Sequence, residues 1–167
     1  MRKLVCVTSA ATMMILVGCA KKPPAQLPPT PGEAAAEGDA AGAGGPVKGS
    51  QADFIASVMA DRIFFDTDQS NVDGEDQAIL RSQAQWLAAN PASRVTLEGH
   101  CDERGTRDYN LALGERRANS AKNYLVSLGV DPARISTISY GKERPDANGS
   151  DEQAWARNRR SVTVVID

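Results

Sequence analysis

Residues 94–118 read RVTLEGHCDERGTRDYNLALGERRA, and the pattern of this stretch changes twice along its length. The first five residues alternate polar and apolar side chains, which is typical of a strand that is half buried in a sheet. Residues 99–105 contain two glycines and three charged side chains, so they predict a loop. Over residues 106–128 apolar and small side chains recur every three or four positions, which predicts a helix that Gly129 ends.

Strand and helix patterns continue on both sides of this stretch. The upstream patterns predict a short helix at 52–60, a strand at 62–65, and a helix that Asp73 caps and Asn90-Pro91 ends. The downstream patterns predict a strand at 135–140, a short helix at 151–157 and an alternating strand at 162–166. Such alternation favours a two-layer α/β sandwich. We expect a roughly four-stranded mixed sheet with helices on one face, in a strand order that the pattern leaves open.

The first 18 residues have the features of an export signal. Arg2 and Lys3 precede an apolar run over residues 4–17, which is too short for a membrane span of about 20 apolar residues. The run ends at Cys19 instead of the small residue usual at a cleavage site. This arrangement resembles the lipobox of bacterial lipoproteins. The resemblance implies that a diacylglycerol is attached to the Cys19 thiol and that Cys19 becomes the first residue of an exported, membrane-anchored chain.

Residues 20–50 are rich in Ala, Pro and Gly and contain only two larger apolar side chains. Such a segment cannot bury enough apolar surface to offset the entropy lost on ordering. We expect a flexible tether with a maximum reach of roughly 100 Å. The predicted organisation is a signal peptide at 1–18, a lipidated cysteine with its tether at 19–50, and one domain at 51–167.

Composition argues against several other kinds of protein. The net charge is −2 and no strongly basic patch stands out, so we expect no nucleic-acid partner. His100, Cys101 and Asp102 are side-chain types found in catalytic sets, but neighbouring side chains of an extended chain point apart. The chain has one histidine, which is too few for the usual zinc sites. Because Cys6 lies in the expected signal peptide and Cys19 would carry the lipid, Cys101 has no disulfide partner. We expect no enzymatic activity, no metal and no cofactor.

The loop and helix of residues 98–118 combine Gly-His-x-Asp with Asn-x-x-Leu-Gly-x-x-Arg-Ala. The positions that carry these motifs are Gly99, His100, Asp102, Asn110, Leu113, Gly114, Arg117 and Ala118. Together with Ser139-Tyr140-Gly141 and Asn158-Arg159-Arg160, they resemble the OmpA-like peptidoglycan-binding domain family over residues 62–166. Cys101 departs from the family, which often has a small or hydroxyl residue there, and its thiol is a weaker hydrogen-bond donor.

The resemblance implies a site for meso-diaminopimelate, an amino acid of the peptidoglycan stem peptide. The far end of diaminopimelate carries an ammonium and a carboxylate on one carbon. Asp102 can accept hydrogen bonds from the ammonium, and the planar guanidinium of Arg117 can hold the carboxylate through two bonds. The resemblance also implies a wall formed by Phe65 and Asp66, and a lining or brace formed by Arg104, Asn110 and Leu113. Taken alone, Phe65 is more typical of a core and Asn110 of a backbone brace.

Two glycines and two arginines have secondary expected roles. Gly99 is expected to allow the backbone to turn, and Gly114 to allow the helix to approach the sheet closely. Arg159 or Arg160 is expected to add positive charge near the site.

The resemblance further implies an outer-membrane lipoprotein of the Tol–Pal system, with its domain in the periplasm and a role in envelope integrity and cell division. Ala20 follows Cys19, where an aspartate would favour retention at the inner membrane. Two functions stay open at this point. The domain either binds peptidoglycan noncovalently and ties the membrane to the wall, or it serves as an adaptor for the periplasmic protein TolB.

Overall fold

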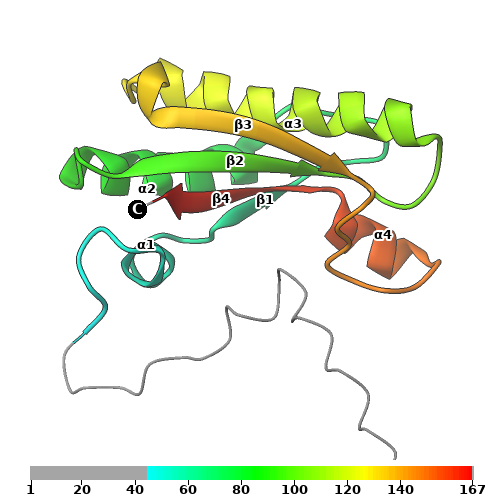
Figure 1. Ribbon diagram of the computed structural model, residues 1–167, viewed down its shortest axis with the longest axis horizontal. Helices are drawn as coiled ribbons and strands as arrows, with labels where there is room; N and C mark the ends of the chain where they lie inside the picture. The colour runs from blue at the N-terminus through cyan, green and yellow to red at the C-terminus, as the bar shows by residue number, and fades with distance from the viewer. Residues whose placement is uncertain (1–44, 167) are drawn as a thin grey trace, which may run out of the picture. The chain divides into compact units, whose positions relative to one another are not determined.

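The computed structural model describes residues 45–166 of the chain (Figure 1). The predicted signal peptide, the lipidation of Cys19 and most of the tether lie outside the described residues. In chain order the elements are α1 (Gln51–Ser57), β1 (Arg62–Phe64), α2 (Gly74–Ala89), β2 (Arg94–His100), α3 (Arg107–Ser127), the 3-10 turn η1 (Pro132–Arg134), β3 (Ile135–Gly141), α4 (Glu152–Asn158) and β4 (Arg160–Ile166). Among residues 45–166, no helix combines the length and apolarity that crossing a bilayer requires.

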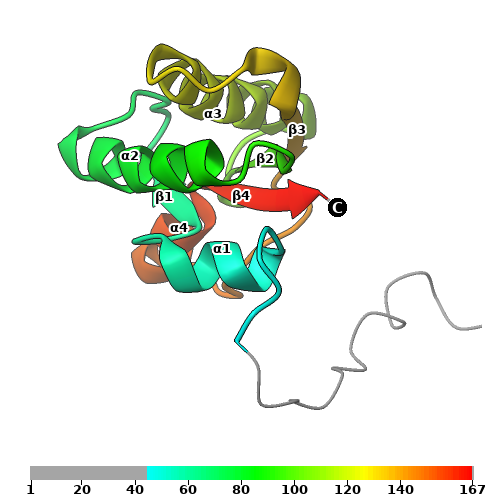
Figure 2. The same ribbon diagram turned by 90° about the vertical axis from the view of Figure 1, so that its left-hand side faces the viewer.

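The four strands form one mixed sheet in the order β1-β4-β2-β3. Strands β2 and β3 run parallel, whereas β4 lies antiparallel to both β1 and β2. Helices α2 and α3 cover the same face of this sheet (Figures 1 and 2). The prediction of a two-layer sandwich with a four-stranded mixed sheet is therefore confirmed.

Local capping explains where the helices begin and end. The Asp73 side chain accepts the Asp76 N–H at 2.9 Å and so caps α2, as predicted. Thr106 caps α3 in the same way by accepting the Tyr109 N–H at 3.2 Å. At the other end of α3, Gly129 has a φ of 93°, in the left-handed region that glycine adopts without strain.

The core lies between the sheet and the two covering helices. Val95 and Leu97 of β2 are buried on one side of the strand, as their alternation with polar residues predicts. The buried side chains that pack with them include Ile63, Leu80, Leu87, Ala118, Ala121 and Leu125. This packing fixes α3 against the end of β2, and the candidate site is built at that junction.

Two glycines let α3 lie directly on β2. A Cβ on Gly99 would overlap the carbonyl oxygen of Gly114, and a Cβ on Gly114 would overlap the hydroxyl of Ser139. The close approach expected for Gly114 is therefore present. The turn expected for Gly99 is wrong, because Gly99 lies within β2 and the strand continues to His100.

We expect Gly99→Ala to lower the free energy of unfolding by about 1–3 kcal/mol, because the added methyl group must push α3 away from the sheet. Chemical denaturation measures this loss. Gly74→Ala is the matched control, since no atom lies within 4 Å of the methyl group it would add. Equal stabilities of the two variants would contradict the assigned role of Gly99.

Candidate functional site

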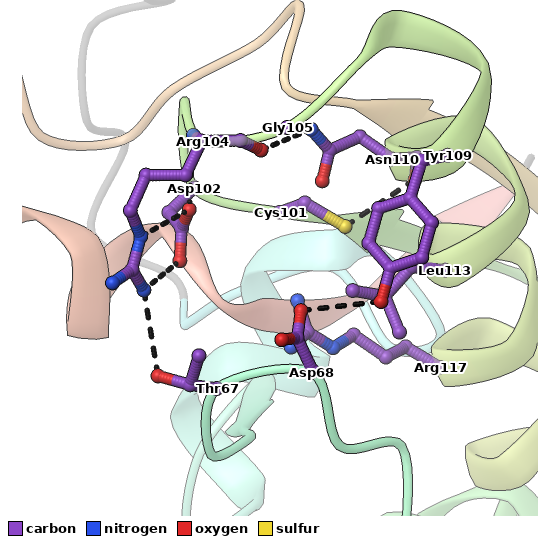
Figure 3. A pocket seen from close by; sticks show the side chains of 10 residues that line it. All are labelled: Thr67, Asp68, Cys101, Asp102, Arg104, Gly105, Tyr109, Asn110, Leu113 and Arg117. Atoms are coloured by element: carbon purple, nitrogen blue, oxygen red, sulfur yellow. Dashed lines mark hydrogen bonds and ion pairs between the residues drawn. The ribbon is translucent and has the colours of Figure 1, made fainter.

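A pocket of about 280 Å³ opens where β2 ends and α3 begins (Figure 3). One wall is the loop that follows β2, another is the first part of α3, and the third is the loop that follows β1. The lining side chains come from Thr67, Asp68, Cys101, Asp102, Arg104, Gly105, Tyr109, Asn110, Leu113 and Arg117. The topology thus brings together residues that lie up to 50 positions apart in the sequence.

Five of the seven predicted ligand-binding residues line this pocket, namely Asp102, Arg104, Asn110, Leu113 and Arg117. The other two lie beneath Arg117. The Phe65 ring belongs to the core and has its centroid 5.1 Å from the Arg117 guanidinium carbon. The Asp66 carbonyl accepts a hydrogen bond from Arg117 Nη2 at 3.0 Å. In this structure Phe65 and Asp66 therefore support the arginine, and neither lines the pocket itself.

Arg117 is a fully buried guanidinium whose exposed fraction is 0%. It donates to the carbonyl oxygens of Gln69 at 2.9 Å, His100 at 2.8 Å and Asp66 at 3.0 Å. Burial lowers the pKa of Arg117 from its usual value, and no carboxylate within residues 45–166 forms an ion pair with it. These three bonds use three of the five N–H groups of the guanidinium, and the Cys101 side chain is also within hydrogen-bond reach of it. The site thus contains a rigid cation without an anionic partner in this part of the chain.

Asp102 supplies the opposite charge. Burial alone would raise the pKa of its carboxyl, but hydrogen bonds from the side chain and backbone of Arg104 outweigh that effect and hold it below its usual value. These bonds run from Arg104 Nη2 to Oδ2 at 2.7 Å, and from its Nε and backbone N–H to Oδ1 at 3.0 and 3.1 Å. Arg159 Nη1 lies 3.7 Å from Oδ2. The carboxylate is therefore ionised and already paired.

Further contacts hold the loop that carries Asp102. Asn110 Nδ2 donates to the Arg104 carbonyl at 2.6 Å, so Asn110 braces the backbone as well as lining the pocket. Lys142 Nζ donates to the carbonyls of Glu103 at 3.1 Å and Gly105 at 2.7 Å. A loop fixed from two sides presents Asp102 in a defined position before any ligand arrives.

The structure adds site residues that the sequence argument did not single out. Thr67 and Asp68 line the pocket, and their position directly after Phe65-Asp66 could have indicated them. The Tyr109 hydroxyl bonds Asp68 Oδ1 at 3.2 Å. Trp155 of α4 lies against Arg104. Nothing in the local sequence identifies Trp155, because only the fold places α4 beside this loop.

Only one of the two arginines expected near the site lies there. Arg159 lies near Asp102, whereas Arg160 bonds the carbonyls of Asn158 and Arg144 and does not reach the pocket. Arg159 therefore adds positive charge at the site and Arg160 does not.

The histidine and the cysteine of the motif do not form a reactive pair. Burial, with a contribution from Arg160, lowers the pKa of His100 to about 4, so its imidazole is neutral at pH 7. Its ring packs near Tyr140 and does not line the pocket. Burial raises the pKa of the Cys101 thiol, which contacts the Asn110 carbonyl at 3.3 Å and stays protonated. Residues 45–166 contain no cluster of side chains that could hold a metal ion.

Comparisons with known proteins agree with this architecture. Residues 64–159 match the OmpA family. The peptidoglycan-associated lipoprotein of Rhizobium meliloti is 53% identical over 152 residues, which cover 91% of this chain and 82% of that protein. The protein of the same name from Pseudomonas putida is 46% identical over 154 residues, or 90% of each chain.

A solved structure gives the same result. The crystal structure of the peptidoglycan-associated lipoprotein from Burkholderia pseudomallei aligns with a TM-score of 0.63 at 41% identity. The alignment covers 68% of this chain and 93% of that one. The chain therefore belongs to the OmpA family and, within it, to the peptidoglycan-associated lipoproteins.

Proposed function

We propose that this lipoprotein binds the stem peptide of peptidoglycan noncovalently, by holding the zwitterionic end of meso-diaminopimelate in the pocket beside α3. The observation that carries this proposal is the pair of opposite charges on the pocket walls. Arg117 offers a buried cation that forms no ion pair with any carboxylate of residues 45–166, and Asp102 offers an ionised carboxylate. A ligand group with an ammonium and a carboxylate on one carbon complements both.

The size and rigidity of the pocket support a small charged group as the ligand. Its volume of about 280 Å³ lies just below the roughly 300–1,000 Å³ of pockets that hold drug-sized ligands, which suits the head of one amino acid. Arg117 is fixed by three carbonyls from two segments, the loop after β1 and the end of β2, so little side-chain entropy is lost when it binds a carboxylate. The pocket contains no activated nucleophile, and we propose reversible binding.

Co-sedimentation of the mature chain with purified peptidoglycan tests this function. The protein is expected in the pellet, and a soluble stem tripeptide that ends in diaminopimelate is expected to release it. The tripeptide with lysine at that position, which lacks the distal carboxylate, is the matched control and should release much less. Protein that stays in the supernatant, or that both peptides release equally, would overturn the proposal.

The anchor proposed for this domain is lipid at Cys19, in the outer membrane, with the domain in the periplasm. Each buried methylene contributes about 0.8 kcal/mol, and one acyl chain gives only marginal binding, so lasting anchorage requires more than one. We expect Cys19→Ser to move the protein from the membrane fraction to the soluble fraction. Mass spectrometry of the mature N-terminus should show acylated Cys19 in the unsubstituted protein, and an unmodified Cys19 would contradict the anchor.

We also propose a place in the Tol–Pal system, with TolB as a partner and a role in envelope integrity and cell division. The alternative is a TolB-binding adaptor for which wall binding is minor. A second depression of about 700 Å³ lies beside β1, and the apolar side chains of Phe64 and Met59 that line it are 46% and 69% exposed. Exposed apolar side chains beside a depression are typical of a surface that binds another protein, which supports a protein partner for this domain. Loss of peptidoglycan retention in pocket variants that still bind TolB would support direct wall binding. Unchanged retention in them would support the adaptor.

A further inference from the structure

Arg104 occupies the acidic wall of the pocket. Its guanidinium holds Asp102 through two parallel bonds, with Nη2 to Oδ2 at 2.7 Å and Nε to Oδ1 at 3.0 Å. Asp102 is the group to which the proposed function assigns the ammonium of the ligand. A cation of the protein itself therefore takes the place that the cation of the ligand would need.

Two further contacts keep Arg104 in that place. Its guanidinium carbon lies 4.2 Å from the centroid of the Trp155 ring, within the range of a cation–π interaction. Its Nη2 also lies 3.4 Å from Thr67 Oγ1, so the side chain spans from the loop after β2 to the loop after β1 (Figure 3). Trp155 is itself oriented by a bond from its Nε1 to Glu103 Oε1 at 3.1 Å.

Arg104 differs from Arg117 in how firmly it is held. Arg117 is fully buried and bonded to three backbone carbonyls, so its displacement would leave buried acceptors unpaired. The Arg104 side chain is 40% exposed, and its guanidinium bonds only side chains. An ion pair at that exposure contributes little to stability, and water can solvate the released guanidinium. Arg104 is thus the charged group of the pocket that can move.

We propose that Arg104 is a displaceable latch, which pairs with Asp102 in the free protein and gives way to the ligand ammonium. This inference rests on the proposed function. It assigns Arg104 a role opposite to direct ligand binding, because a latch lowers the affinity for the ligand. It also keeps the buried Asp102 carboxylate paired when the pocket is empty, and its return to Asp102 favours release of the wall.

The test titrates the mature chain and its Arg104→Ala variant with two soluble tripeptides, one ending in diaminopimelate and one in lysine. Because both ligands present an ammonium to Asp102, the latch predicts that Arg104→Ala binds each about fivefold more tightly than the unsubstituted chain. Arg107→Ala is the matched control. It removes the same charge from an exposed side chain that pairs with Glu143 and does not contact Asp102, so we expect unchanged affinities.

The outcomes separate the latch from other roles of Arg104. If Arg104 holds the carboxylate of the ligand, Arg104→Ala weakens binding of the diaminopimelate peptide and leaves the lysine peptide unchanged, which would overturn the latch alone. If neither peptide binds the unsubstituted chain or the Arg104→Ala variant, both the proposed function and the latch are wrong. The tryptophan fluorescence of the protein gives a second readout. The diaminopimelate peptide should change it in the unsubstituted chain, and much less in Arg104→Ala or in Trp155→Phe, which retains only Trp86. A change of equal size in all three would also contradict the latch.

Discussion

Arg117→Met is expected to abolish retention on peptidoglycan, with a loss of affinity of at least a hundredfold. The substitution removes the buried cation that would hold the ligand carboxylate, and breaking a buried charge pair of this kind costs about 3–5 kcal/mol. It also leaves the carbonyls of Asp66, Gln69 and His100 without their donor. Co-sedimentation with purified peptidoglycan, at several protein concentrations, measures the loss.

Two companion variants keep this prediction interpretable. Arg116→Met removes the same charge from the adjacent, exposed position of α3, so its retention should match that of the unsubstituted protein. Arg117→Lys keeps a positive charge but cannot bond three carbonyls through a planar fork, and we expect most of the affinity to be lost. Circular dichroism and thermal unfolding show whether each variant is folded. Normal retention by a folded Arg117→Met protein would contradict the role of the guanidinium.

Asp102→Asn is expected to weaken binding of the diaminopimelate tripeptide by about 2–5 kcal/mol, because the ammonium loses its anionic partner at nearly unchanged shape. Isothermal titration measures this change. Asp108→Asn is the matched control, since Asp108 is an exposed carboxylate in the first turn of the same helix. If the two variants bind equally well, Asp102 does not receive the ammonium.

The same carboxylate predicts a pH dependence. Arg104 holds the pKa of Asp102 below its usual value, so Asp102 stays ionised throughout mildly acidic conditions. Binding through Asp102 should therefore persist above its usual pKa of about 4 and weaken only as the pH falls through the lowered value. The affinity of the Asp102→Asn variant should not show this decrease at low pH. A loss of affinity between pH 7 and pH 5 would point to a different titrating group.

The strands, the helices and their caps could be predicted because their signals are local. The alternation of Val95 and Leu97 and the capping residue Asp73 act within a few positions of the chain. The strand order could not be predicted, since the insertion of β4 between β1 and β2 depends on contacts between distant segments. The role of Gly99 was missed for the same reason, because it depends on contact with Gly114 across two elements.

The candidate site was predictable only in part. The motif residues of one loop and one helix indicated Asp102 and Arg117, and the structure places both on one pocket. Two of the three carbonyls that fix Arg117 belong to the loop after β1, about 50 positions earlier, and no sequence pattern marks a backbone acceptor. The contact of Arg104 with Trp155 depends likewise on where the fold places α4.

Binding of a zwitterionic amino-acid head by two fixed opposite charges is the claim from which the other conclusions follow. Isothermal titration of the mature chain with three tripeptides tests it most directly. The peptides end in diaminopimelate, in diaminopimelate with its distal carboxylate converted to an amide, and in lysine. We expect the first to bind at least tenfold more tightly than either of the others, since each of those lacks the anion that Arg117 would hold. Equal affinities for all three peptides would contradict the account.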